Sequence, residues 1–394
     1  MTHSSTTTDP GLSTPTPWSR ALGVAVVLSL VVGVILLLFA WPAVTASPQN
    51  LPVGVVGDDA QVTQVEATVS EKAEGAVALT RYDSRDAAVA AIERRESYGA
   101  IVLGASPTDA PEVLTASAAS STVAQMLNDL AQSMQAVIDE QIRSTVEAQI
   151  TAAQQEVAAR IQSVLEAVRS GQTPQIPEAG SSGSVQIPVV TVTVTDIVPF
   201  AASDPRGAAL GVASFPLVLG GLAVGIVSTL VVRGSAVRRV TTVVVAAVGA
   251  GLVLAGILQG LFGALQGSFW LNAAACAATI AAIAATVTGC AGLLGPAGVG
   301  LGAAFTMLFA NPLSAAAIPV EFLLQPWGAI GQWLPPGAAA TLLRSLSYFP
   351  DAATAQQWTV LLLWAAGGLA LTLVDLPARR LRAGQTAAAH PLTV

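Results

Sequence analysis

The chain has 394 residues, of which 53% are apolar and only 10% are charged. Because soluble globular domains carry about 25% charged residues, this composition excludes an ordinary soluble domain. The net charge of -7 gives no general electrostatic reason to bind nucleic acid. Two cysteines, with His3 and His390 at the extreme ends, leave little material for thiol or metal chemistry, so we expect no catalytic centre, cofactor or metal site.

The charges are strongly segregated along the chain. Residues 46–206 contain 20 acidic and nine basic residues, whereas residues 240–320 contain no Asp, Glu, Lys or Arg. A bilayer core of about 30 Å needs roughly 20 consecutive apolar residues per helix. The pattern therefore predicts an α-helical polytopic membrane protein with one inserted water-exposed domain, embedded in a lipid bilayer.

Six stretches are long and apolar enough to cross the membrane. They are residues 21–41, 209–232, about 240–267, 272–293, 298–319 and 358–376. The arrangement is one span, then the hydrophilic domain, then five spans within residues 209–376. Pro216 in the second span, and the Asn311–Pro312 pair in the fifth, predict kinks because proline removes a helical hydrogen bond.

The basic residues orient these spans, since Lys and Arg in short loops stay on the cytoplasmic side. With six spans and both termini inside, the inner segments collect seven arginines: Arg20, Arg233, Arg238, Arg239, Arg379, Arg380 and Arg382. We therefore expect cytoplasmic tails at 1–20, which is Ser/Thr/Pro-rich and predicted to be disordered, and at 377–394. Residues 46–206 would then be extracytoplasmic. High Ala content and Arg in place of Lys are typical of a GC-rich bacterium, so the predicted location is a bacterial cytoplasmic membrane.

Two segments allow other interpretations. The first span could be a cleaved signal peptide, with Val44 and Ala46 at the cleavage site, although its apolar core is longer than the usual 7–15 residues. Residues 322–343 could form a further span. The prolines and the two tryptophans, Trp327 and Trp333, favour instead a re-entrant or interfacial hairpin of short helices on the outer side, over about 320–350.

The hydrophilic domain alternates strand-like and helical segments, which predicts an α/β fold. Expected strands are 51–56, 76–80, 98–103, 111–115 and 185–195; expected helices are 62–74 and 86–97, the latter capped by Ser84. A long helical arm is predicted over about 121–169, with apolar residues every three or four positions. This narrow stripe indicates packing either within the domain or against a second chain.

The spans offer no internal source of energy for transport. A proton- or sodium-coupled carrier keeps ionisable groups at mid-membrane depth, and none is found there. The phosphate-binding sequence GxxxxGK[ST] is missing, and the only lysine, Lys72, lies in EKAEG. An active transporter built on this chain would need a separate ATPase subunit.

The arrangement resembles the membrane subunit of an ABC-2-type transporter, and most closely the YhgE/Pip (phage infection protein-like) branch. The resemblance rests on one span, the outer domain with LPVGVVGDD and AAIERRESYGAIVL, five further spans, and the outer hairpin QPWGAIGQWLPPGAAATLLRSLSYF. It covers nearly the whole chain and implies an exporter-like permease. The cytoplasmic loop RGSAVRR is short for the coupling helix that such permeases present to an ATPase.

Two functional hypotheses follow. In the first, the chain is an export permease for a lipid, peptide or drug-like molecule, working as a homodimer or heterodimer with an ATPase. Arg233, Arg238 and Arg239 would contact the ATPase or lipid headgroups. Glu321, Trp327 and Trp333 would form an outer gate. In the second, the acidic outer domain makes the chain a non-transporting envelope receptor, scaffold or assembly protein.

Overall fold

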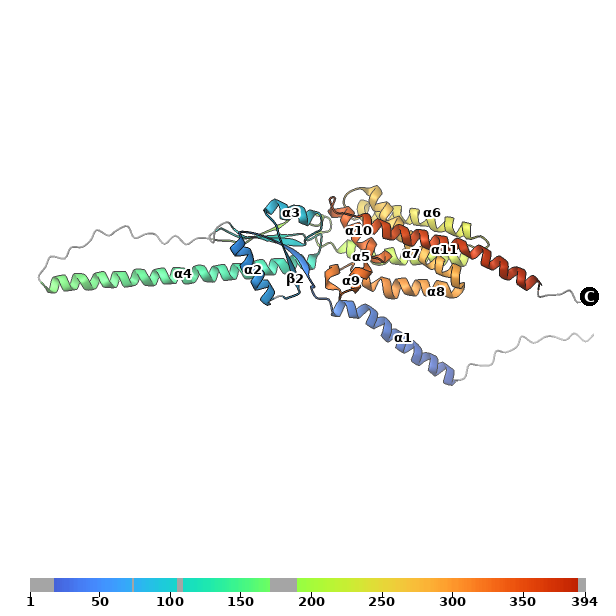
Figure 1. Cartoon of the computed structure of the whole chain (residues 1–394), viewed down its shortest axis with the longest axis horizontal. Helices are drawn as coiled ribbons and strands as arrows, with labels where there is room; N and C mark the ends of the chain where they lie inside the picture. Colours follow the sequence, from blue (N-terminus) through green and yellow to red (C-terminus); the bar gives the residue numbers. More distant parts are fainter. Residues whose placement is uncertain (1–17, 73, 105–108, 171–189, 389–394) are drawn as a thin grey trace, which may run out of the picture.

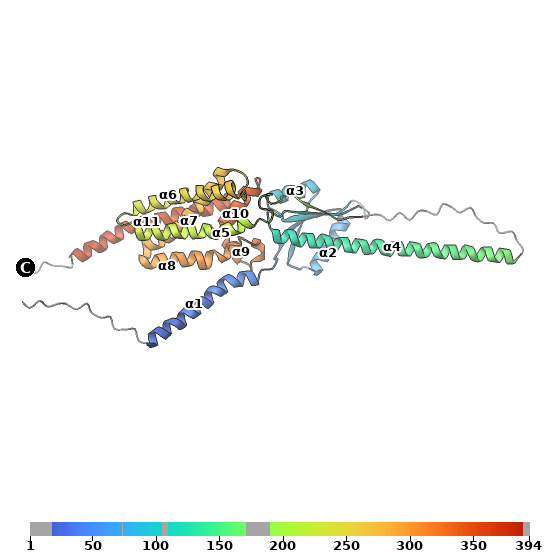
Figure 2. The same cartoon turned by 180° about the vertical axis from the view of Figure 1, so that it is seen from behind.

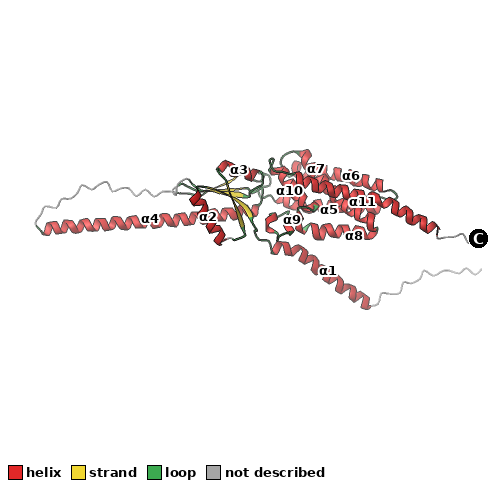
Figure 3. Cartoon of the chain, in the orientation of Figure 1, coloured by secondary structure: helices red, strands yellow, loops and turns green. Residues whose placement is uncertain are grey.

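The computed structural model describes residues 18–72, 74–104, 109–170 and 190–388. The molecule is elongated, with a helical bundle at one end, a small α/β domain in the middle and a single projecting helix at the other end (Figure 1). Among the described residues, strands occur only in the central domain, as Figure 3 shows. Residues 1–17 of the expected N-terminal tail, and residues 389–394 of the C-terminal tail, lie outside the described residues.

Five helices in the described part of the chain are long and apolar enough to cross a membrane. They are α1 (Trp18–Val44), α5 (Ala208–Val231), α6 (Ala236–Ala255) with its π-helical continuation η1 (Gly256–Leu261), α7 (Phe269–Leu294) and the first part of α11 (Ala355–Ala388). Their positions match five of the six expected spans, so the chain is a polytopic membrane protein. Helix α11 continues to Ala388, through residues that we had expected to form a tail.

The remaining expected span, 298–319, is only partly helical. Helix α8 (Pro296–Ala304) and the π-helix η2 (Phe305–Ala310) together contain 15 residues, or about 22 Å at helical rise. Instead of a kink at Asn311–Pro312, the helix ends there and the short helix η3 (Pro312–Ser314) follows. Proline lacks an N–H and disfavours helical geometry in the preceding residue, which explains this end.

The other predicted kink site behaves differently. Helix α5 passes through Pro216 without interruption, and the proline ring is exposed on the outside of the bundle. At the far side of η3, the expected hairpin of short helices is present as η4 (Val320–Phe322), α9 (Trp327–Gly331) and α10 (Pro335–Tyr348). Helix α10 is largely buried against α7 and α11, at the end of the bundle next to the α/β domain (Figures 1 and 2).

Helix α7 forms the axis of the bundle, and glycines on the surrounding helices lie against it. A Cβ on Gly225 of α5 would lie 2.8 Å from Val287, and one on Gly251 of α6 would lie 2.6 Å from the Ala273 carbonyl oxygen. Gly298 and Gly302 of α8 and Gly368 of α11 meet α7 in the same way. Small residues let membrane helices approach closely, so these glycines set the packing of the bundle.

The sheet of the α/β domain has the strand order β2-β1-β3-β4-β5. Its strands are β1 (Leu51–Val56), β2 (Val77–Arg81), β3 (Gly99–Val102), β4 (Glu112–Thr115) and β5 (Thr193–Asp196). All neighbouring pairs are parallel except β3 and β4. The strand predictions are close to these bounds, except that β5 is much shorter than 185–195, of which 185–189 lie outside the described residues.

Helices cover both faces of this sheet. Helix α3 (Arg85–Glu93) packs Ala88 and Ile92 against one face, and its N-terminus is capped by Ser84 as predicted, with the Ala87 N–H donating to the Ser84 hydroxyl over 3.1 Å. The first turns of α4 (Ser121–Arg169) pack Val123 and Leu127 against the other face. Both faces are thus apolar and covered. The cluster on the α3 face continues into the bundle, where it includes Leu342 and Phe349.

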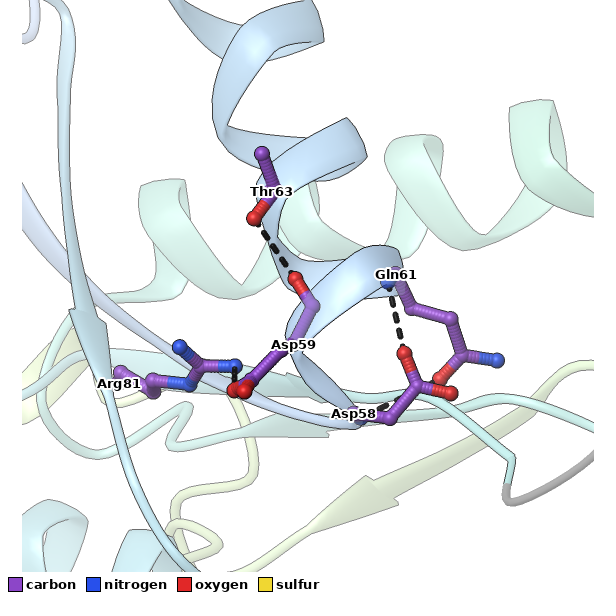
Figure 4. A network of polar contacts seen from close by, with 5 residues as sticks. All are labelled: Asp58, Asp59, Gln61, Thr63 and Arg81. Carbon is purple, nitrogen blue, oxygen red and sulfur yellow. Dashed lines mark hydrogen bonds and ion pairs between the residues drawn. The ribbon is translucent and has the colours of Figure 1, made fainter.

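Helix α2 (Asp59–Lys72) is fixed at its start by reciprocal hydrogen bonds, shown in Figure 4. The Gln61 N–H donates to the Asp58 carboxylate over 2.8 Å, while the Asp58 N–H donates to the Gln61 side chain over 3.4 Å. An ion pair between Arg81 and Asp59 ties strand β2 to the same turn. This capping box explains why the helix begins at Asp59 rather than at Val62, where we expected it.

The bounds of helix α4, 121–169, agree with the predicted arm. Its 49 residues extend about 70 Å at helical rise. Only the first four turns pack on the sheet, and beyond them the helix projects away from both the domain and the bundle (Figure 1). Beyond the sheet the predicted stripe is half-buried at Ile138, Ile142, Val146 and Val164, and exposed at Ile150, Val157, Ile161 and Val168.

Candidate functional site at the junction of the two parts

The α/β domain meets the helical bundle through a small set of polar contacts. The Tyr98 hydroxyl, just before β3, donates to the Glu321 carboxylate over 2.7 Å. The Nη1 of Arg95 donates to the Thr341 carbonyl oxygen over 3.2 Å and to the Ser345 hydroxyl over 2.8 Å, both on α10. Residues 95–98 of the domain are thus joined to η4 and α10 of the membrane part.

The backbone of Arg95 has an unusual conformation. The N–H of Glu96 donates to the Ala91 carbonyl and that of Arg95 to the Ile92 carbonyl, which is the Schellman pattern that ends a helix. The residue at the position of Arg95 must be left-handed and is usually glycine, yet here it is an arginine with φ of 60°. A left-handed conformation costs a residue with a Cβ roughly 1–2 kcal/mol. Such strain is typically retained where the side chain has a function.

The Arg95 side chain lies in the wall of a polar cavity of about 280 Å³. The cavity is lined from both parts of the protein, by Arg94, Arg95, Ser97 and Tyr98 of the domain, and by Glu321, Gln332, Thr341, Ser345 and Gln357 of the membrane part, among others. The Oε1 of Gln357 is buried and has no hydrogen-bond partner within the described structure. An unsatisfied buried acceptor in a cavity wall is a feature that requires an explanation.

Three charged residues line this cavity, Arg94, Arg95 and Glu321. Arg94 pairs with Glu96, with a guanidinium-carboxylate distance of 2.9 Å, and Arg95 interacts with Glu321, while the buried guanidinium of Arg344 lies near Arg95 outside the lining. Burial lowers the pKa of Arg95, and burial together with the charge of Arg95 lowers the pKa of Arg344 to about 10. Burial and the Glu321 carboxylate raise the pKa of Tyr98, which keeps its hydroxyl protonated as a donor. Both guanidinium groups stay charged near neutral pH.

An apolar groove of about 340 Å³ lies on the other side of residues 320–324. It is formed by α1, by the η2–η3 region and by the loop after η4, and its lining includes Leu37, Trp41, Phe309, Leu313, Leu324 and Trp327. Helix α1 is otherwise exposed along its length and stands apart from the other spans (Figures 1 and 2). Val320 and Glu321 line the polar cavity, whereas Leu323 and Leu324 line the groove.

The structure divides the three residues that we predicted to form an outer gate. Glu321 lines the polar cavity, and Trp327 lines the apolar groove with its ring edge-on to Phe309 at 6.2 Å. Trp333 lines neither space and is exposed, while its carbonyl accepts a hydrogen bond from Trp364 over 2.9 Å. Glu321 and Trp327 thus line two different spaces, and Trp333 lines neither.

The three arginines predicted to contact an ATPase or lipid lie at the opposite end of the bundle. Arg233 and Arg238 are exposed, but Arg239 is only 7% exposed, on the face of α6 that also carries Gly251 and packs on α7. Its Nε and Nη1 have no partner among the described residues. Arg233 and Arg238 are accessible to a protein partner, whereas Arg239 is not.

Sequence reasoning missed Arg95 and Tyr98. The helix over 86–97 was predicted to run past Arg95, because a Gly that would mark a helix end is not present there. The sequence could have pointed to Arg344 as a candidate site residue, since it is the only charged residue between Glu321 and Asp351. Comparisons with protein-family models, curated proteins and solved structures returned no match.

Proposed function

We propose that the chain is the membrane subunit of an ABC-2-like export permease, related to the YhgE/Pip branch, that moves an amphiphilic substrate across the cytoplasmic membrane. The observation that carries this proposal is the groove beside α1. A span that stands apart from its bundle leaves an apolar surface open sideways, where a molecule can enter from the hydrocarbon region of the bilayer. Inert bundles bury such faces, because exposed grooves lose packing contacts.

The proposal includes six crossings with both termini in the cytoplasm. The start of α1 and the end of α11 lie at the same end of the molecule, opposite the α/β domain (Figures 1 and 2). Helix α8 runs alongside the other spans and returns the chain to the domain end, so it acts as the fifth crossing, completed by η3 and α9. Non-helical backbone at membrane depth is tolerated where protein surrounds it.

The energy would come from a separate ATPase that binds the end of the bundle carrying Arg233 and Arg238. Within the candidate spans of the described structure, the charged residues are Arg238 and Arg239, in the first turn of α6, so ion coupling through the middle of the bundle has no chemical support. We further propose a dimer, because permeases of this type work in pairs and the outer faces of α5 and α6 are apolar and exposed.

Membrane purification tests the proposal. We expect a tagged full-length chain, extracted gently from its native membrane, to retain an ATPase that contains GxxxxGK[ST]. The double variant Arg233→Ala/Arg238→Ala should reduce its recovery at least severalfold, while the matched surface variant Arg81→Ala should not. ATP should drive accumulation of a fluorescent amphiphile in inside-out vesicles. Repeated recovery of the chain without any ATPase, with accumulation unchanged by ATP, would contradict the proposal.

A second function has one specific observation in its favour. The projecting part of α4 exposes several apolar residues of one stripe, at Ile150, Val157, Ile161 and Val168, that no gate requires. If the chain is instead an envelope receptor or scaffold, removal of residues 137–169 with the following loop should abolish partner binding and leave no transport defect, because there would be no transport to lose. Loss of transport on the same deletion would favour the permease.

A further inference from the structure

We infer that the junction cavity binds a phosphate group, and that residues 320–324 allow the apolar chain of the same molecule to lie in the groove beside α1. The ligand class is thus an anionic phospholipid or a related phosphate-bearing amphiphile. The inference rests on the proposed function in that it names a substrate class for it, but the binding itself can be measured without transport.

The first argument concerns Arg95. Of the three guanidinium nitrogens of Arg95, only Nη1 donates hydrogen bonds to described residues, which are Thr341 and Ser345. These contacts, and the Phe349 ring at 5.3 Å from the guanidinium carbon, hold the side chain in place. The remaining Nε and Nη2 form the edge of the guanidinium that binds phosphate or carboxylate oxygens in pairs. The strained, left-handed backbone of Arg95 places this group in the cavity wall.

The second argument concerns the buried charge next to the cavity. Arg95 lines the cavity together with Glu321, whose carboxylate already accepts a hydrogen bond from Tyr98. The guanidinium of Arg344 is buried near Arg95 but outside the lining; its Nη2 donates to the Ala316 carbonyl, while its Nε has no partner in the described structure. Buried charges are normally paired, and none of the ion pairs among the described residues includes Arg344, so an anion bound at Arg95 would compensate its charge.

The third argument is the unsatisfied Oε1 of Gln357. This oxygen accepts hydrogen bonds and cannot bind a bare anion, but it can accept one from a hydroxyl next to the phosphate. A glycerol headgroup carries such hydroxyls. The cavity of about 280 Å³ has room for a phosphoglycerol group, and Glu321 in its lining is two residues from Leu323, which lines the groove.

Binding to the purified full-length protein in detergent tests the inference, with dihexanoyl phosphatidylglycerol and inorganic phosphate as probes. Arg95→Gly removes the guanidinium without straining the backbone, and we expect it to weaken binding of both probes roughly tenfold or more. Arg95→Lys keeps the charge but loses the paired geometry, so it should weaken binding less. Arg81→Ala, a surface arginine of the same domain, is the control and should bind like the wild type.

Leu324→Gln separates the two sources of phosphate. If a lipid is the ligand, this variant weakens binding of the phosphatidylglycerol and leaves binding of inorganic phosphate unchanged. If inorganic phosphate binds as tightly as the lipid, and Leu324→Gln affects neither, the phosphate site stands and the groove is not part of it.

Two results would overturn the inference. One is that neither probe binds the wild type. The other is that both probes bind Arg95→Gly as tightly as the wild type, while the variant has the thermal midpoint of the wild type. Failure of the proposed function looks different, because lipid would still bind while ATP-driven accumulation is absent. Accumulation with no lipid binding would instead leave the permease standing without this substrate.

Discussion

The hydroxyl of Tyr98 and the carboxylate of Glu321, 223 positions apart in the sequence, are joined by a hydrogen bond of 2.7 Å. This contact connects the start of strand β3 to the short helix η4, and so joins the α/β domain to the membrane part. Because Arg95 contacts α10 three residues earlier in the chain, one short segment of the domain carries both side-chain contacts described here.

Removing the Tyr98 hydroxyl should weaken this connection. We expect Tyr98→Phe to destabilise the full-length protein by about 1.5–3 kcal/mol, since hydrogen bonds to charged groups are worth that much and the carboxylate would lose its donor. Glu321→Gln should cost less, because the amide oxygen still accepts. The apparent thermal midpoint in detergent would be measured for both single variants and the double variant. Strictly additive effects would mean that the two groups are not coupled.

Position 95 offers a comparison of two variants that both lack the guanidinium. Arg95→Gly should be more stable than Arg95→Ala by about 1 kcal/mol, because only alanine must place a Cβ in a left-handed backbone. Chemical denaturation followed by circular dichroism would compare the pair. Equal stability of the two variants would show that the backbone at this position is not left-handed in solution.

Substitution by alanine should destabilise the protein at one of two adjacent glycines of α11 and be neutral at the other. A Cβ on Gly368 would overlap the Ala285 carbonyl of α7, whereas a Cβ on Gly367 would meet nothing within 4 Å. Gly368→Ala should therefore destabilise the bundle by about 1–3 kcal/mol through overpacking, while Gly367→Ala should be neutral. Thermal midpoints and the yield of folded protein after detergent extraction measure the difference. Equal thermal midpoints and yields of the two variants would contradict the packing of Gly368, rather than Gly367, against α7.

The Glu112 carboxylate predicts acid sensitivity of the α/β domain. Its hydrogen bond with Arg85, at 2.7 Å, lowers the pKa of Glu112, and the Thr195 hydroxyl at 2.6 Å acts in the same direction. A lowered folded-state pKa stabilises the protein above the unfolded value of about 4.3, and this stabilisation disappears as the pH falls through the folded value.

Glu112→Gln should therefore destabilise the protein at neutral pH by up to about 1 kcal/mol, a value limited by the partial exposure of the pair. The difference from the wild type should shrink as the pH falls below about 4.3 and vanish once the pH is below the lowered folded-state pKa of Glu112. Thermal midpoints of both proteins between pH 3 and pH 7 would be compared. A difference that stays constant across this range would argue against ionisation of Glu112 as its cause.

Much of the architecture could be predicted from the sequence, because it depends on local patterns. Uninterrupted apolar stretches located five spans, and the Ser84 cap located the start of α3. The arm was predicted over about 121–169 from apolar residues at every third or fourth position, and helix α4 has these bounds. The shortening of the fifth span was missed, because apolar composition continues past Pro312 although the helix ends.

The candidate site was predicted only in part. Glu321 and Trp327 are unusual residues in an apolar region, so their sequence context drew attention to them. Arg95 and Tyr98 lie among many polar residues of the domain, and their contacts with Ser345 and Glu321 cross more than 200 positions of chain. Such contacts depend on how parts of the chain that are distant in sequence meet in the fold, which no local pattern encodes.

The segment between α1 and strand β1 has a mechanical consequence. The N–H groups of Ser47 and Gln49 donate to the carbonyls of Phe322 and Glu321, over 3.2 and 3.0 Å. A movement of α1 in the plane of the bilayer would therefore first strain these two backbone hydrogen bonds. Through them it would act on Glu321, whose carboxylate accepts a hydrogen bond from Tyr98. A displacement of helix α1 would thus act directly on residues 321 and 322, where the α/β domain contacts the membrane part.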